Sequence, residues 1–245
     1  MNWKRIREAL RGFSAAGNLL PCPLCRHGDG GGINAFCPEC LAQLPRVGGP
    51  PCPGCGGALD GALAFCSQCL EEPLRPWRQA VTVFEYRGEV REVIAKFKYG
   101  NRPELARPLG ILAAAEVRRR GISAAVIVPI PLHFLRRLHR SYNQAELLAR
   151  VIGRELNLPV VPALRRVGRG RKQATLDRAG RHRNPRGIFV PAAALVPKIS
   201  GRSVLLVDDV FTTGATLAAA AEVLISAGCG EITVLSCARG RRYSG

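Results

Sequence analysis

Two adjacent carboxylates, followed by hydroxyl side chains and a glycine, are the residues of this chain that most clearly suggest chemistry. They lie in the stretch VLLVDDVFTTGAT, residues 204–216, where Asp208 and Asp209 follow an apolar run. The turn after them includes Thr212, Thr213, Gly214, Ala215 and Thr216. Hydroxyl donors and a backbone left open by glycine suit a phosphate, whereas carboxylates suit sugar hydroxyls or a magnesium ion. A ribose that carries a phosphate satisfies both halves of the stretch.

Two predicted elements would position these residues. The apolar run before Asp208 predicts a buried strand, and residues 215–227 predict a helix that begins at once. A loop between a parallel strand and a helix presents free backbone N–H groups and the positive end of the helix dipole to a ligand. Strand ends often carry Asp and loops often carry Gly and Thr, so ordinary turn chemistry is the alternative. The whole stretch resembles the phosphoribosyl diphosphate (PRPP) motif of type I phosphoribosyltransferases.

A repeated cysteine pattern near the N-terminus indicates bound metal. Eight of the ten cysteines precede residue 70 and form four C-x-x-C pairs, separated by eleven, eleven and ten residues. The eight are Cys22, Cys25, Cys37, Cys40, Cys52, Cys55, Cys66 and Cys69. Two pairs supply the four thiolates of a tetrahedral structural zinc site, so the pattern predicts about two zinc ions.

Disulfides are the alternative for these eight cysteines. We favour zinc because the N-terminal sequence lacks the uncharged apolar block of a secretion signal. Sequential and crossed pairings of the C-x-x-C pairs both fit the spacing, and sequential pairing is our preference. The region has few large apolar residues, so metal would replace a missing core. We interpret Cys229 and Cys237 as small buried residues near the last strand.

The rest of the chain alternates between predicted strands and helices. We expect strands at 79–86, 124–130, 159–164, the run that ends at Asp208, and 231–237, and helices at 88–98, 103–120, 142–156 and 215–227. This alternation is typical of an α/β domain with a mostly parallel sheet and flanking helices. We therefore predict two units, an N-terminal helix with a double zinc ribbon over 1–75 and the α/β domain over 76–245.

Hydropathy predicts a cytoplasmic protein with no membrane insertion. The longest apolar runs are too short or too interrupted to span a bilayer. Trp3, Ile6, Leu10 and Phe13 recur at helical spacing near the N-terminus, which favours a docking or core-facing helix over a membrane anchor.

The strand predicted at 124–130 leads into a second candidate for an anion-binding loop. Pro129, Ile130 and Pro131 mark its end, and the arginines of residues 136–140 follow before the next helix. Prolines can simply end a strand, and loop arginines are usually solvated, so the pattern by itself leaves both interpretations open.

A strongly basic segment occupies residues 165–186. It holds nine Lys or Arg side chains, among them Lys172 and Arg178, against the single acid Asp177. Such a run cannot pack as a core, so it predicts an exposed loop. Its guanidinium groups suit a diphosphate, and a merely solvated loop is the alternative.

Taken together, these features make the chain similar to the ComF family. The shared markers are the four C-x-x-C pairs, VPIPLH at 128–133, SYNQAELLA at 141–149, KQATL at 172–176 and VDDVFTTGAT at 207–216. The resemblance covers nearly the whole chain and implies a phosphoribosyltransferase-like domain behind a double zinc ribbon.

The same resemblance suggests a role for each candidate residue. The paired carboxylates would accept hydrogen bonds from the ribose hydroxyls of PRPP, which binds together with magnesium. The turn at 212–216 would hold the 5′-phosphate, and residues 129–131 would contact the diphosphate under a closing loop that contains Lys172 and Arg178. Family members are implicated in the uptake of transforming DNA alongside a helicase-like partner, and others are named for gluconate utilisation.

The net charge points to a second class of partner. It is +18, and the first 78 residues, with eight basic and six acidic side chains, contribute only +2. The remaining +16 would attract single-stranded DNA in a salt-dependent way, although arginine preference in a GC-rich genome gives the same imbalance. Two hypotheses follow: a phosphoribosyltransferase, for example one that salvages a nucleobase, and a non-catalytic adaptor that binds DNA and docks partners through its zinc ribbons. The sequence leaves open whether transfer is catalysed.

Overall fold

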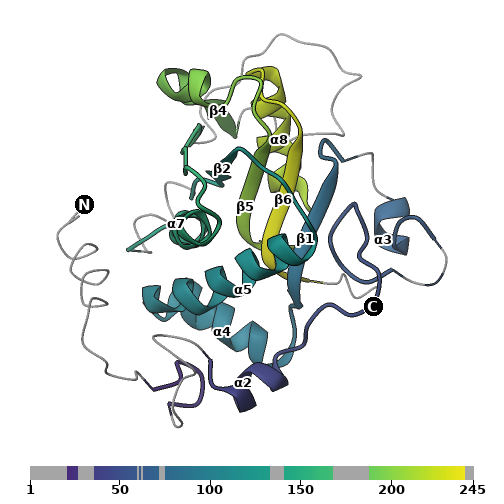
Figure 1. Cartoon of the computed structure of the whole chain (residues 1–245), viewed down its shortest axis with the longest axis vertical. Coiled ribbons are helices and arrows are strands. Elements are labelled where there is room, and N and C mark those ends of the chain that lie inside the picture. Colours follow the sequence, from purple (N-terminus) through teal and green to yellow (C-terminus); the bar gives the residue numbers. More distant parts are fainter. Residues whose placement is uncertain are drawn as a thin grey trace.

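A four-stranded parallel sheet forms the centre of the chain in the computed structural model (Figure 1). The structure describes residues 21–26, 36–59, 61, 63–71, 75–132, 141–167 and 188–240. The strand order is β1-β6-β5-β2, with β1 at Gln79–Glu85, β6 at Ile232–Arg239, β5 at Val204–Phe211 and β2 at Val126–Pro129. All the pairings in this sheet are parallel, which confirms the predicted fold class.

Helices cover both faces of this sheet. On one face lie α4 (Gly88–Tyr99), α5 (Ala106–Arg119) and α7 (Gln144–Leu156), which share a core with Leu205 and Leu235. On the other face, α8 (Ala215–Ser226) shares a core with Leu206 and Val234. Alternate residues of the central strands thus enter two cores, which is why these strands are continuous apolar runs in the sequence. In the described part of the chain, every helix is too short or too polar to cross a bilayer.

Two elements differ from their prediction. The helix expected at 103–120 begins as a separate 3-10 turn, η1 (Pro103–Leu105), before α5. The strand expected at 159–164 is wrong, because Val160 forms only an isolated bridge with Ile127. Pro159 and Pro162 cannot donate backbone hydrogen bonds, so a ladder cannot extend across this segment.

The strand in this region begins later and belongs to a second sheet. It is β3 (Leu164–Arg166), which pairs antiparallel with β4 (Phe189–Pro191). A 3-10 segment, η3 (Ala193–Lys198), then leads from β4 to β5.

The cysteine-bearing segments lie along the side of β1 that faces away from β6. Glu85 N–H donates to the Pro45 carbonyl at 2.8 Å, and Val47 N–H donates to the carbonyl of Val83 at 3.1 Å. Farther along the strand, Ala80 N–H donates to the carbonyl of Pro53 at 2.8 Å. These backbone contacts hold the N-terminal segments directly against the sheet.

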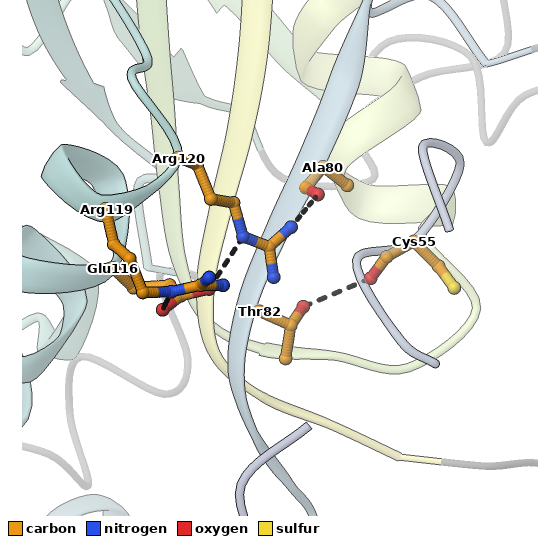
Figure 2. Close-up of polar contacts among 6 residues, drawn as sticks. All are labelled: Cys55, Ala80, Thr82, Glu116, Arg119 and Arg120. Carbon is orange, nitrogen blue, oxygen red and sulfur yellow. Dashed lines mark hydrogen bonds and ion pairs between the residues drawn. The ribbon is translucent and has the colours of Figure 1, made fainter. Parts of the chain in front are cut away.

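Side chains add further bonds to β1 (Figure 2). The Thr82 hydroxyl donates to the carbonyl of Cys55 at 3.1 Å. Arg120, which follows α5, donates to the carbonyl of Ala80 at 3.5 Å, and the Glu116 carboxylate lies 2.7 Å from its Nε. β1 is thus paired with β6 along one edge and bonded to the cysteine-bearing segments along the other, while Arg120 reaches it from the end of α5.

Two short helices lie within the cysteine-bearing segments. α2 (Pro38–Gln43) lies beside α4, and α3 (Ser67–Leu70) lies beyond β1 (Figure 1). The boundary between units near residue 75 stays a prediction. The predicted docking helix over 3–13 lies outside the described residues.

Candidate functional site

The fold brings cysteine sulfur atoms together in two groups of four. The first cluster comprises Cys22, Cys25, Cys37 and Cys40, and the second cluster comprises Cys52, Cys55, Cys66 and Cys69. Within each cluster the sulfur atoms lie within 4.8 Å of one another, which confirms the predicted sequential pairing. The sulfur atoms of Cys25 and Cys37 are 3.8 Å apart, and those of Cys55 and Cys66 are 3.6 Å apart.

These separations fit zinc better than disulfides. Two thiolates on a tetrahedral zinc ion, at about 2.3 Å each, lie roughly 3.8 Å apart. A disulfide would need about 2.05 Å between sulfur atoms, and the ten cysteines, all of them described, form none. Both clusters therefore have the donor set and spacing of a closed structural zinc site. Cys237 is buried as predicted, whereas Cys229 is only partly buried in the loop before β6.

Backbone groups shape both clusters. Cys37 N–H donates to Cys22 Sγ at 3.3 Å, and Cys66 N–H donates to Cys52 Sγ at 3.4 Å. Gly56 has a φ of +71°, and a Cβ at this position would lie 2.6 Å from the backbone nitrogen of Thr82. Glycine is therefore required where the second cluster meets β1.

A different charged group lies beside each cluster. Arg239, at the end of β6, donates to Cys66 Sγ in the second cluster at 3.7 Å. In the first cluster, the Glu39 carboxylate lies 3.7 Å from Cys37 Sγ. Neither Arg239 nor Glu39 was predicted from the sequence to lie beside a cluster.

The predicted carboxylates lie within β5, which continues past Asp208 to Phe211. Asp209 N–H donates to Asp208 Oδ1 at 2.9 Å, and Lys98 Nζ of α4 lies 2.8 Å from Asp209 Oδ1. This ion pair is largely buried, since 17% of the Lys98 side chain and 12% of the Asp209 side chain are exposed. Burial and the charge of Asp209 raise the pKa of Asp208 to about 7. Near neutral pH, the Asp208 carboxyl therefore exchanges between its ionised and protonated forms.

Lys98 was not among the predicted site residues. It follows Phe97 directly and lies four residues after Ile94, and both of these side chains are fully buried. The sequence signal that could have identified Lys98 is its position at the border of the apolar stripe of an amphipathic helix.

The start of α7 ties the end of α4 to the end of β2. The Tyr142 hydroxyl donates to the carbonyl of Phe97 at 2.6 Å, and Gln144 Nε2 donates to the same carbonyl at 3.2 Å. Asn143 Nδ2 donates to the carbonyl of Ile130 at 3.0 Å. These bonds explain the polar SYNQ sequence before an apolar helix, and they position the lysine at the sheet edge.

The predicted phosphate turn, residues 212–216, spans the connection from β5 to α8 and the first two residues of α8. Gly214 has a φ of 78° and immediately precedes the first residue of α8. Ala215 N–H donates to Thr213 Oγ1 at 3.3 Å, and both Thr212 and Ala215 are exposed. The first backbone N–H groups of a helix have no acceptor within the helix, so an anion can bind them here.

The segment Pro129–Ile130–Pro131 lies one strand away from the carboxylates. Pro129 is opposite Val207 in the parallel pair of β2 and β5, and Ile130 N–H donates to the carbonyl of Val207 at 2.9 Å. The carboxylates, the turn and this segment therefore meet at the carboxyl ends of neighbouring strands. Other residues predicted to contact the diphosphate lie outside the described part of the chain: Lys172, Arg178 and the arginines of residues 136–140.

Comparisons with known proteins agree with this architecture. Residues 109–244 match the phosphoribosyl transferase domain family. The DNA utilization protein YhgH of Escherichia coli K12 is 32% identical over 219 residues, which cover 87% of this chain and 94% of that protein. Competence protein F of Haemophilus influenzae is 32% identical over 213 residues, covering 84% of this chain and 91% of that protein. Competence protein ComFC of Bacillus subtilis is 28% identical over 202 residues, covering 78% of each chain.

Proposed function

Because the chain belongs to the ComF family of proteins with a phosphoribosyl transferase domain, we propose that it binds a ribose phosphate such as PRPP. The observation that carries this proposal is the meeting of three features at the carboxyl ends of β2 and β5: the paired carboxylates, the turn at 212–216 and the segment at 129–131. The carboxylates would accept hydrogen bonds from the ribose hydroxyls. The turn would bind the 5′-phosphate through N–H and hydroxyl groups, and residues 129–131 would face the diphosphate.

The charges at this edge suit such a ligand. Lys98 offsets the charge of Asp209, which reduces the repulsion between two adjacent carboxylates and an anionic ligand. Carboxylate oxygens are also ligands that magnesium accepts, and magnesium bound with PRPP would neutralise charge on the diphosphate. In the catalytic form of this proposal, a nitrogen nucleophile attacks the anomeric carbon while the bond from that carbon to pyrophosphate breaks. Stabilisation of the charge that develops in the transition state would supply most of the rate acceleration.

Titration calorimetry with PRPP and magnesium tests this proposal. The double variant Asp208→Asn, Asp209→Asn should bind at least about tenfold more weakly than wild type, equivalent to about 1.4 kcal/mol, because charge-assisted hydrogen bonds are lost. Glu231→Gln, at an exposed acid paired with Arg78, is the matched control. Unchanged affinity in the double variant would show that the two acids only belong to a strand, and absence of binding by wild type would overturn the proposal. A screen of nucleobases for pyrophosphate release then decides whether transfer is catalysed.

We further propose a role in the uptake or processing of transforming DNA. The names of the relatives support it, and so does the charge of +16 carried by the chain after residue 78. Single-stranded DNA and a helicase-like competence protein are the proposed partners, and the cytoplasm is the proposed location because thiolate zinc sites suit a reducing compartment. A non-catalytic adaptor that binds DNA through its basic surface is the second candidate, favoured by the same charge.

The salt dependence of DNA binding separates these candidates. Replacement of Arg169, Arg171 and Lys172 by Ala should lower the slope of log affinity against log salt by up to about two, at roughly 0.7 per lost phosphate contact on a single strand. A lower slope with intact PRPP binding favours the adaptor, and the reverse result favours the enzyme. If wild type fails to bind single-stranded DNA even at low salt, the net charge reflects composition alone.

A further inference from the structure

Arg75 lies beside two aromatic rings at the start of the phosphate turn. Its guanidinium carbon is 5.6 Å from the centroid of the Trp77 ring and 5.9 Å from that of Phe211. The two rings are perpendicular to each other, with centroids 6.1 Å apart. Rings at this distance attract a cation, so they fix the position of the guanidinium. Phe211 is the last residue of β5, directly before the turn.

The same guanidinium touches the turn itself. A Cβ at Gly214 would lie 3.0 Å from Nη1 of Arg75 and 2.7 Å from Cζ of Phe211. Only glycine therefore lets the arginine approach the residue that precedes α8. A guanidinium at this point adds charged, directional donors to the helix N–H groups and threonine hydroxyls, and this donor set suits a phosphate monoester.

Trp77 connects this arginine to the second cluster. Its indole Nε1–H donates to the carbonyl of Gly54 at 3.1 Å, and the side chain is part of the buried core that contains Cys52 and Cys55. Gly54 lies against a ligand sulfur, because a Cβ there would be 2.9 Å from Cys69 Sγ. The indole therefore keeps its acceptor only while the second cluster keeps its shape.

We propose that Arg75 binds the 5′-phosphate of the ribose ligand and that the second cluster, when it holds zinc, keeps Arg75 in place. The inference rests on the proposed ribose-phosphate site and adds a residue that lies before the sheet in the chain. Zinc at the second cluster and phosphate at the turn are then linked, and each strengthens the binding of the other. The first cluster, which packs in the opposite core with α4 and α5, has no part in this link.

Calorimetry on the full chain, with ribose 5-phosphate and inorganic phosphate as probes, tests the role of Arg75. Arg75→Ala should weaken the binding of both probes by about tenfold, because a charged donor to phosphate is lost. Arg78→Ala is the matched control, since Arg78 lies three residues away, is exposed and pairs with Glu231 at 3.0 Å. The double variant Asp208→Asn, Asp209→Asn should weaken ribose 5-phosphate much more than inorganic phosphate.

The outcomes distinguish the inference from the proposed function. If wild type binds ribose 5-phosphate and Arg75→Ala binds it equally well, the role of Arg75 is overturned while the ribose-phosphate site stands. If wild type binds neither ribose 5-phosphate nor PRPP, both fall. Equal losses in Arg75→Ala and Arg78→Ala would reduce the effect to general charge and also overturn the role.

Zinc affinity tests the link to the second cluster. In equilibrium competition with a chromophoric chelator, saturating ribose 5-phosphate should raise the affinity for one of two zinc ions by about fivefold or more, at the lower end of typical coupling between sites. Trp77→Phe keeps an aromatic ring but loses the hydrogen bond to Gly54, so this variant should lose most of the increase. Identical zinc affinities with and without ribose 5-phosphate in wild type would overturn the link.

Discussion

The two cysteine clusters share one ligand chemistry but lie in different surroundings. The first cluster shares a core with α4 and α5, which includes Phe97. The second cluster shares a core with α8, which includes Trp77 and Phe211. Each core reaches a different part of the proposed ribose-phosphate site, since α4 presents Lys98 to the carboxylates and Trp77 contacts Arg75 at the turn. Local spacing thus defines a metal site, whereas the neighbours of that site decide what it is connected to.

The electrostatic surroundings of the two clusters also differ. Burial and hydrogen bonding shift the thiol pKa values in both directions within each cluster: the pKa is lowered for Cys22 in the first and Cys55 in the second, and raised for Cys40 in the first and Cys69 in the second. What distinguishes the two clusters is the charge of the side chain beside each of them. Four thiolates leave a zinc site with net negative charge, which Arg239 offsets and Glu39 increases. We therefore expect the second cluster to hold zinc more tightly.

Removal of one ligand from each cluster should give the largest effects. Cys22→Ser and Cys52→Ser should each leave about one zinc ion per chain instead of about two, measured by elemental analysis. Cys22→Ser should disrupt the N-terminal segments and leave the sheet largely folded. Cys52→Ser should lower the melting temperature of the sheet more, because Cys55 and Gly54 within the second cluster bond to Thr82 of β1 and to Trp77, whereas the bonds of Pro45 and Val47 to β1 lie beyond the last ligand of the first cluster. Structural zinc contributes roughly 10–16 kcal/mol of binding free energy, so both changes should be evident by circular dichroism.

Two results would break this contrast. Equal melting curves for the two variants would show that the two clusters contribute equally to the stability of the sheet. Wild-type protein without zinc, with its eight N-terminal cysteines in disulfides, would remove the zinc interpretation altogether.

Replacement of the charged residue beside each cluster should have the next largest effect, on the rate of zinc release. Arg239→Gln should speed the release of zinc from the second cluster to a chelator by about tenfold or more, in the range typical of groups that contact metal ligands. Glu39→Gln should slow release from the first cluster, because a repulsive charge is removed. The paired measurement sharpens the comparison, and release rates that are unaffected by either change would mean that ligand spacing alone sets zinc retention.

The smallest effect should follow from replacement of Lys98, which lies on the same face of the sheet as the first cluster, and it should appear in the pH dependence of PRPP affinity. The ionised Asp208 carboxylate accepts stronger, charge-assisted hydrogen bonds from ribose hydroxyls than the protonated acid does, so PRPP affinity should rise as pH increases through about 7. The charge of Lys98 lowers the pKa of Asp208, and Lys98→Met should therefore move this rise to higher pH. Arg75→Ala should weaken binding without moving the midpoint. Calorimetry between pH 6 and 9 measures both, and a midpoint that stays fixed in Lys98→Met would contradict the assignment of Lys98 to the carboxylates.

Patterns local in the sequence predicted much of this molecule. The C-x-x-C spacing predicted two clusters but fitted both sequential and crossed pairing, and the structure has the sequential pairing that we preferred. The apolar runs predicted the four strands of the parallel sheet. The strand predicted at 159–164 was wrong for a reason that is visible in the sequence, since two prolines interrupt the apolar run. The carboxylates and the turn were found because one strand, loop and helix carry them together.

The three missed cations reach their places through contacts between distant residues. Arg239 and Cys66 are 173 positions apart, and they meet because the end of β6 lies near the second cluster. Lys98 meets Asp209 only because the C-terminal end of α4 lies beside β5, and Arg75 meets Gly214 only beside Phe211. Such contacts depend on strand order and packing, which periodicity in a single sequence does not encode.

The hydrogen bonds along the outer side of β1 have a consequence for the handling of this protein. β1 is an edge strand, and unpaired backbone groups on such a strand can form new ladders with the same strand of another molecule. The segments that cover it through Pro45, Val47 and Pro53 depend on metal for their shape. Chelators should therefore cause self-association and precipitation before they abolish ligand binding, so that zinc acts in this fold as a guard against aggregation.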